Sequence, residues 1–178
     1  MKKVVITGHT SGIGQAIYNY FSQDSNNTVV GFSRSNGFDI QNPKKRAEII
    51  SYSKDADIFV NNAYNWKYDD DSQLKTLRDI FNAWAGQNKM IINISSIAPA
   101  QAVQTTYSLL KGGLDDFCFS KTFNLPHIIN LKPSWVMVDS LKAEIGNKPH
   151  MTTGQLVDVL DFCLKNPIKI RELTFLNI

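Results

Sequence analysis

The sequence has few cysteines, little net charge and no long hydrophobic run. Its 178 residues carry 19 basic and 16 acidic side chains, a formal net charge of +3. A charge this small and this scattered gives no signal for nucleic-acid binding. Lys2 and Lys3 precede only the short apolar run VVIT, which predicts neither a signal peptide nor a membrane span. We therefore expect a cytoplasmic protein that binds neither nucleic acid nor membrane.

The scarcity of cysteine excludes a disulfide framework. Cys118 and Cys163 lie in apolar, helix-like stretches, FCFS and DFCLK. Cysteines in such a context are typical of buried free thiols in a reducing compartment, and they do not indicate a disulfide or a metal pair. We therefore predict two free thiols and no metal site.

What the chain does contain is an alternation of strand and helix signals. Its length fits one domain, residues 1–178, and it shows no repeat and no linker. Short apolar runs alternate with segments whose apolar residues recur at helical spacing. This pattern predicts an α/β fold with a doubly wound parallel sheet of about seven strands, the Rossmann arrangement. The strand candidates include KKVVITG, NTVVGFS, DIFVNNA, KMIINISS, HIINLKPS and RELTFLNI.

Single residues mark several helix boundaries. Asn42 followed by Pro43 predicts the N-cap and the first position of a helix in NPKKRAEIISYS. Gly86 is a predicted stop for the helix in DDSQLKTLRDIFNAWAG. A further helix is expected from about Thr105 to Ser120.

A glycine-rich turn, TGHTSGIG, joins the first predicted strand to the first helix. Glycines permit unusual dihedral angles and let the backbone approach a pyrophosphate. The start of the helix then offers free N–H groups and the positive end of its dipole to the anion. The turn predicts a dinucleotide site, and a purely structural strand-to-helix turn is the alternative. The residues expected to touch the cofactor are Gly8, Thr10, Ser11, Gly12, Ile13 and Gly14, of which Ser11 can also cap the helix.

Tyr107 and Lys111 form a second motif, TTYSLLKGG, downstream of Ser96 in NISSIAP. Residues at i and i+4 share one face of a helix, so both side chains can reach one ligand. A lysine ammonium lowers the pKa of a neighbouring phenol from about 10 toward neutral, which makes proton exchange useful at cellular pH. Such a pair also arises often by chance, so its weight comes from the glycine turn and from the order of the motifs.

In this order, TGxxxGIG, NNA, ISS and YxxxK resemble the single-domain branch of the short-chain dehydrogenase/reductase family. The glycine spacing differs from the TGGxGxxG form of the extended sugar-nucleotide epimerases. The resemblance implies an oxidoreductase that reduces a small carbonyl compound or oxidises the corresponding alcohol. It implies that Ser96 donates a hydrogen bond to the carbonyl oxygen, that Tyr107 exchanges the proton, and that Lys111 supports Tyr107 and holds the cofactor ribose. The alternative is a catalytically weak dinucleotide-binding or sensor protein of the same fold.

The segment after the second strand favours NADP(H) over NAD(H). No acidic residue occurs from Gly31 to Gly37, where an NAD site usually places a carboxylate for the ribose 2′-hydroxyl. Arg34, between Ser33 and Ser35, suits a 2′-phosphate through charge-assisted hydrogen bonds, and a solvated surface arginine is the alternative. Asp39 resembles a family aspartate that meets the adenine amine, and it can equally be a turn residue.

Two further segments are cofactor contacts by resemblance. One matches the NNAG motif near the adenine ribose, with tyrosine in place of the glycine, and the other matches the turn that borders the nicotinamide, with serine in place of the glycine. The residues concerned are Asn62, Ala63 and Tyr64 in the first segment and Pro133, Ser134 and Val136 in the second.

The chain departs from the family pattern at two further points. The family often uses an asparagine to hold a proton-relay water; Asn65 and Asn82 are the candidates here, or the residue is absent. The segment SLKAEIGNKPH is a short replacement for the family's substrate lid, which predicts an open pocket.

By analogy with the family, we expect a homodimer or homotetramer formed through the helix that carries Tyr107 and the helix before it.

Overall fold

Six parallel strands form the centre of the fold. The computed structural model describes residues 1–65, 70–101, 104–139 and 142–177 of the chain. Within these residues the strands pair in the order β2-β1-β3-β4-β5-β6, and each pair is parallel. Their bounds are β1 Lys2–Thr7, β2 Asn27–Phe32, β3 Ile58–Asn61, β4 Met90–Ile94, β5 His127–Pro133 and β6 Glu172–Phe175.

The prediction of about seven strands is corrected to six in the described residues. The chain leaves β2 through the short 3₁₀ turn η1 (Arg34–Asn36) and the helix α2 (Pro43–Tyr52), and then a second turn, η2 (Ser53–Asp55), leads to β3. Because β3 pairs with β1 on the side away from β2, β2 is left as the edge of the sheet. The strand candidates read from the sequence are all strands, and none of the described residues forms a strand outside β2.

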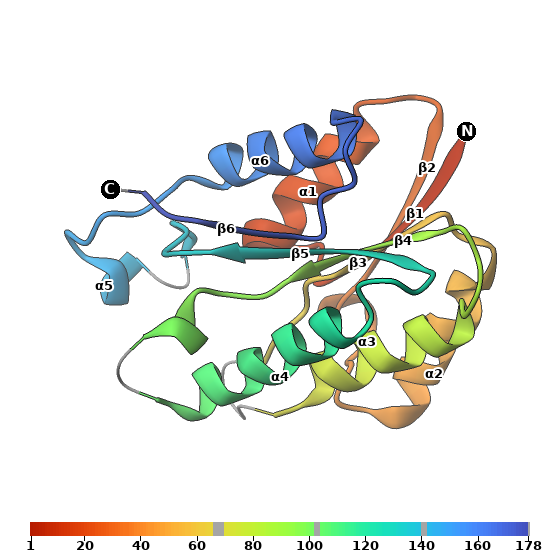
Figure 1. Cartoon of the computed structure of the whole chain (residues 1–178), viewed down its shortest axis with the longest axis horizontal. Coiled ribbons are helices and arrows are strands. Elements are labelled where there is room, and N and C mark those ends of the chain that lie inside the picture. The colour runs from red at the N-terminus through yellow and green to blue at the C-terminus, as the bar shows by residue number, and fades with distance from the viewer. Residues whose placement is uncertain (66–69, 102–103, 140–141, 178) are drawn as a thin grey trace.

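Helices cover both faces of the sheet. α1 (Gly12–Ser22) and α6 (Thr153–Lys165) lie on one face, whereas α2, α3 (Ser72–Ala83) and α4 (Thr106–Ser120) lie on the other (Figure 1). The short helix α5 (Lys142–Ile145) follows β5. This arrangement confirms the doubly wound parallel sheet. In the described ranges, no single helix is both long enough and apolar enough to cross a membrane.

Successive side chains of the central strands contribute to two separate apolar layers. Val4 and Ile6 of β1 pack on the α1 and α6 side, whereas Val5 between them packs on the side of α3 and α4. Because neighbouring residues of a strand point to opposite faces, a strand covered on both faces is apolar throughout. Cys163 belongs to the first layer and Cys118 to the second, so both thiols are buried and free, as predicted.

The predicted helix boundaries hold at two of three positions and shift at the third. The Asn42 side chain accepts hydrogen bonds from the N–H groups of the first turn of α2, which begins at Pro43. Thr105 is the N-cap of α4. α3 ends at Ala83, a few residues before Gly86, whose positive φ of 74° forms the turn that leads to β4.

Candidate active site

A pocket of about 970 Å³ lies at the carboxyl ends of the strands. The chain turns to opposite sides of β1 to form β2 and β3, and a doubly wound sheet binds its ligands at such a reversal of strand order. Apart from Asn82, a candidate for the fourth catalytic residue, the structure brings every residue predicted for catalysis or cofactor binding to this one pocket. They are Gly8, Thr10, Ser11, Gly12, Ile13, Gly14, Ser33, Arg34, Ser35, Asp39, Asn62, Ala63, Tyr64, Ser96, Tyr107, Lys111, Pro133, Ser134 and Val136. Their individual roles remain predictions.

The glycine turn is shaped so that backbone lines the pocket. Gly8 has a φ of 74°, a left-handed conformation that favours glycine. At Gly14, a Cβ atom would lie 2.1 Å from the carbonyl oxygen of Gly8, so the start of α1 packs directly on the turn. Ser11 stands at the N-cap, but its side chain makes no capping hydrogen bond. The first N–H groups of a helix have no partner within it, so the turn could hold a phosphate against α1.

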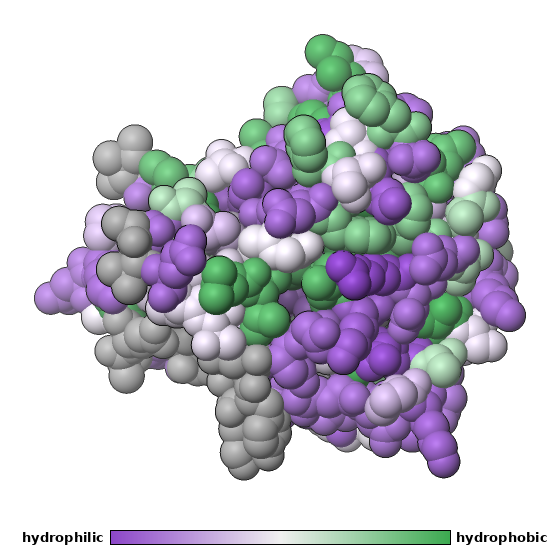
Figure 2. Space-filling view, turned by 60° about the horizontal axis from the view of Figure 1, so that its bottom comes forward, coloured by the Kyte–Doolittle hydropathy of each residue, from purple (hydrophilic) through white to green (hydrophobic). Residues whose placement is uncertain are grey.

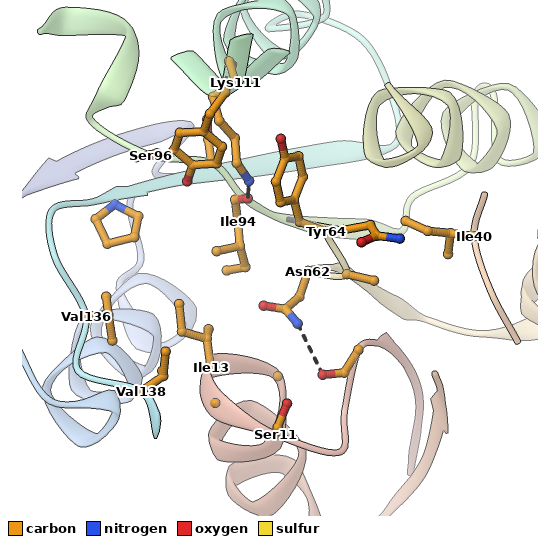
Figure 3. A pocket seen from close by; sticks show the side chains of 18 of the residues that line it. Ser11, Ile13, Ile40, Asn62, Tyr64, Ile94, Ser96, Lys111, Val136 and Val138 are labelled. Atoms are coloured by element: carbon orange, nitrogen blue, oxygen red, sulfur yellow. Dashed lines mark hydrogen bonds between the residues drawn. The ribbon is translucent and has the colours of Figure 1, made fainter. Parts of the chain in front are cut away.

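Asn62 holds the end of β3 against the glycine turn. Its Nδ2 donates to the carbonyl oxygen of Thr7 at 3.1 Å and points toward the turn in Figure 3. The backbone N–H groups of Asn62 and Ala63 donate to Thr7 Oγ1 at 3.0 and 3.1 Å. The NNA segment therefore links two neighbouring strand ends through hydrogen bonds of Asn62 and Ala63 to Thr7.

Arg34 lies on the pocket rim beside the end of β2. Its side chain is exposed, and the neighbouring hydroxyls of Ser33 and Ser35 lie 2.8 Å apart. Asp39 lines the same region, and its Oδ1 accepts a hydrogen bond from the N–H of Gln41 at 3.0 Å. Asp39 is thus a turn residue that also faces the pocket, so both interpretations of it are compatible with the geometry.

Two adjacent serines at the end of β4 have different environments. Ser95 is buried, and its N–H donates to the carbonyl oxygen of Leu131 in β5 at 2.8 Å. Ser96 lines the pocket, and its Oγ accepts a hydrogen bond from the N–H of Ala98 at 3.1 Å. Because that bond uses an acceptor site of the hydroxyl, the O–H proton of Ser96 can be donated to a bound molecule.

Tyr107 and Lys111 meet at the pocket wall together with Tyr64. The rings of Tyr64 and Tyr107 pack edge to face with their centroids 5.3 Å apart. The Lys111 Nζ lies 4.9 Å from the Tyr64 ring centroid and 5.5 Å from the Tyr107 ring centroid. Tyr64, the residue that departs from the motif, therefore lies at the same end of the pocket as Tyr107 and Lys111 (Figure 3).

Lys111 is almost completely buried, at 3% exposure. Its Nζ donates to the carbonyl oxygen of Ile94 at 3.1 Å and to Gln73 Oε1 at 2.8 Å. Burial lowers the pKa of Lys111 to about 7, and the charge of Asp115 opposes that shift only in part. The lysine therefore changes charge in the pH range where an enzyme would use it.

Neither candidate for the fourth catalytic residue has a hydrogen bond to Lys111 in the described part of the chain. Asn82 is exposed on α3 and lies outside the residues that line the pocket. Asn65 is buried in the pocket wall, and its Nδ2 donates to Gln41 Oε1 at 2.7 Å. The described side chain that accepts a hydrogen bond from Lys111 is Gln73, which was not among the predicted site residues.

The position of Gln73 on its helix was a signal that could have identified it. Gln73 begins a stripe along α3 that continues through Leu77, Ile80 and Trp84, all of which are fully buried. A polar residue on an otherwise apolar helical stripe is buried with its neighbours and needs hydrogen-bond partners there. Gln73 is only 1% exposed and satisfies this requirement.

The segment after β5 contributes the remaining wall of the pocket. Pro133 ends β5, and Ser134 and Val136 follow it along the wall. Ser134 Oγ is buried and has no hydrogen-bond partner among the described residues, so it is suited to a polar group of a ligand. Of the short segment predicted as a lid, residues 140 and 141 lie outside the described residues, and the open pocket stays a prediction.

No protein-family model and no curated protein matches this chain, whereas solved structures do. A short chain dehydrogenase from Burkholderia cenocepacia J2315, in complex with NADP, is 18% identical with a TM-score of 0.79 over 97% of this chain and 87% of that chain. A serine dehydrogenase complexed with NADP+ is 18% identical with a TM-score of 0.75 over 97% and 94% of the two chains. The 3-alpha-hydroxysteroid dehydrogenase from Pseudomonas sp. B-0831, complexed with NADH, is 15% identical with a TM-score of 0.74 over 98% and 94%. This chain therefore has the doubly wound α/β fold of these dehydrogenases.

Proposed function

We propose that this chain is an NADP(H)-dependent oxidoreductase of the short-chain dehydrogenase/reductase type, which reduces a carbonyl compound or oxidises the corresponding alcohol. The observation that carries the proposal is the joint lining of one pocket by the glycine turn and by Ser96, Tyr107 and Lys111. The three solved structures described above support it, since they hold NADP, NADP+ or NADH.

The residues present fit a nicotinamide dinucleotide. The backbone of the glycine turn would receive the pyrophosphate, Arg34 with Ser35 would receive a 2′-phosphate, and Ser134 Oγ offers a polar contact farther along the wall. When bound, the nicotinamide supplies the hydride in reduction or accepts it in oxidation. The protein then binds and orients the cofactor and the substrate, and its side chains transfer one proton.

In the reductive direction, Ser96 and Tyr107 act on the substrate oxygen. Ser96 donates its O–H to the carbonyl oxygen as negative charge develops there. Tyr107 gives its phenolic proton to the same oxygen and recovers a proton from solvent. The buried charge of Lys111 stabilises the phenolate that Tyr107 becomes. The oxidative direction reverses each of these transfers.

A second candidate is a dinucleotide-binding sensor with weak catalysis. The observation that favours it is the Tyr64 ring, which occupies space directly beside Tyr107 and Lys111. A bulky ring at this position narrows the approach of a substrate to the phenol. Turnover separates the two candidates, because both bind the cofactor.

The test begins with fluorescence titrations of NADPH and NADH, followed by a screen of aldehydes and ketones. We expect tighter binding of NADPH and measurable turnover, and Tyr107→Phe should lower turnover about 10²–10⁴-fold without loss of NADPH binding. Tyr52→Phe, at an exposed tyrosine outside the pocket, is the matched control. Tight NADPH binding without turnover of any carbonyl would favour the sensor, and a preference for NADH would contradict the role of Arg34.

We further propose a homo-oligomer formed through α3 and α4, in a cytoplasmic protein. Leu109 and Phe119 on α4, and Phe123 just after it, expose 61%, 79% and 98% of their surface. Figure 2, which brings the α3 and α4 side forward, shows hydrophobic residues in separate groups among hydrophilic ones. Light scattering should give a dimer or tetramer for the wild type and a smaller species for Phe119→Lys, and a monomeric wild type would contradict the proposal.

A further inference from the structure

Lys111 is held without a direct carboxylate partner in the described residues. Its hydrogen-bond acceptors are one main-chain carbonyl, of Ile94, and one side-chain amide oxygen, of Gln73. Asp115, one turn farther along α4, acts on it only through its charge. A buried ammonium normally needs such acceptors to remain charged, so the two oxygens determine how readily Lys111 stays protonated.

The orientation of the Gln73 amide follows from its other contacts. Its Nε2 donates to the carbonyl oxygens of Asn61 at 3.0 Å and Ile94 at 2.9 Å, at the ends of β3 and β4. The backbone carbonyl of Gln73 accepts in turn from Asn61 Nδ2 at 3.2 Å. A flipped amide would set its oxygen against two carbonyl oxygens and its NH₂ against an ammonium. Only Oε1 can therefore face Lys111.

We propose that Gln73 is the positioning residue for Lys111: its fixed amide oxygen holds the ammonium beside the Tyr64 and Tyr107 rings and keeps it charged. This inference rests on the oxidoreductase function proposed above. An amide stabilises the ammonium by a hydrogen bond but carries no charge of its own, so the positive charge still acts on Tyr107. A carboxylate in its place would hold the lysine as firmly and cancel that charge.

The same contact explains how Lys111 can work in a buried site. Burial favours the neutral amine and, opposed only in part by the charge of Asp115, lowers the pKa of Lys111 to about 7. Among the described residues, the titratable or charged groups around the ammonium are Tyr64 after β3 and Tyr107 and Asp115 on α4. In the described residues α3 presents the neutral Gln73 to it, and β4 presents the carbonyl of Ile94. Gln73 thus opposes burial without adding charge.

The first experiment follows the lysine itself. In the cofactor-free protein, labelled with ¹³C at lysine Cε, the Lys111 resonance is titrated by NMR in the wild type, Gln73→Met and Gln73→Glu. We expect the midpoint to fall by about one pH unit in Gln73→Met, the size expected for losing one hydrogen bond to a charged group, and to rise in Gln73→Glu. Thr76→Val is the matched control, because it removes a buried hydroxyl of the same helix whose hydrogen bond goes to Ser72.

A purely structural role for Gln73 would not move the two midpoints in opposite directions. Equal midpoints in the wild type and Gln73→Met would overturn the inference, as would a shift of the same size in Thr76→Val. If one variant fails to fold, the other still tests the sign of the shift.

The second experiment follows kcat/KM against pH for any carbonyl that the wild type reduces. The decline in kcat/KM that accompanies loss of the Lys111 proton should move to lower pH in Gln73→Met and to higher pH in Gln73→Glu. The maximum value of kcat/KM should be lower in Gln73→Glu. Shifted Lys111 midpoints in a protein that reduces no carbonyl would support the role of Gln73 toward Lys111 and reject the oxidoreductase function. Turnover of a carbonyl together with an unchanged Lys111 midpoint would support the oxidoreductase function and reject the role of Gln73.

Discussion

The two ends of the pocket are built from different parts of the polypeptide. The end at the glycine turn is mainly backbone, where Gly8 and Gly14 leave no room for side chains. The end at Tyr107 depends on buried polar side chains, since Asn61, Gln73 and Lys111 are each at most 3% exposed. A backbone site is sensitive to added atoms, whereas a side-chain site is sensitive to lost hydrogen bonds and to pH.

The largest effect we expect comes from Lys111, at the side-chain end. Burial lowers its pKa to about 7 from the ordinary 10.5. Between these pH values the unfolded chain binds a proton that the folded chain does not. The free energy of unfolding should therefore rise by about 1.4 kcal/mol per pH unit from this residue, beginning near pH 7 and levelling off near the ordinary value. Lys111→Met should lack this rise.

Urea unfolding of the wild type and Lys111→Met at a series of pH values measures the difference directly. Lys132→Met is the control, because Lys132 has the opposite behaviour. Burial works against its charge, but the hydrogen bond with Glu172 and the charge of Asp115 together raise the pKa of Lys132. Its stabilising contribution is therefore fully present below the ordinary lysine value and is lost only above it. A wild-type minus Lys111→Met difference that stays constant from pH 7 to pH 10 would refute the buried-lysine account.

The same contrast explains what the sequence could predict. The glycine turn is recognisable because backbone recognition requires glycine at fixed local spacings, and β1, β3, β4 and β5 are recognisable because buried strands are mainly apolar. The contact of Gln73 with Lys111 was not predicted because it joins helices far apart in the sequence. Only the packing of α3 brings the two residues together. The six strand segments named from the sequence are all strands, and the seventh that was expected has no counterpart in the described residues.

Added atoms at the backbone end should have the next largest effect. In Gly14→Ala the new Cβ would lie 2.1 Å from the Gly8 carbonyl oxygen and 2.5 Å from Asn62 Nδ2. We expect a loss of about 1–3 kcal/mol in the free energy of unfolding, from overpacking, together with weaker NADPH binding. The measurement is urea unfolding combined with a fluorescence titration.

Gly112→Ala is the matched control, since Gly112 is also helical but its Cβ would meet nothing closer than Pro99 Cβ at 3.9 Å. In a helix with room for a methyl group, alanine should stabilise by about 0.5–1 kcal/mol. Similar effects of the two substitutions would show that the close contact at Gly14 is not what constrains the turn.

Arg34 is where the comparison between the two ends is weakest, because there a side chain rather than backbone would recognise the cofactor. Arg34 is exposed, so water and salt screen its charge, and we expect Arg34→Ala to weaken NADPH binding only about tenfold, or about 1.4 kcal/mol. NADH binding should not change, because NADH lacks the 2′-phosphate. Lys44→Ala, at an exposed basic residue outside the pocket, controls for net charge. The tenfold effect should shrink as salt is added, because screening shortens the reach of an exposed charge. An equal loss of NADH and NADPH affinity would instead mean that Arg34 shapes the turn, and backbone would then account for the whole cofactor end.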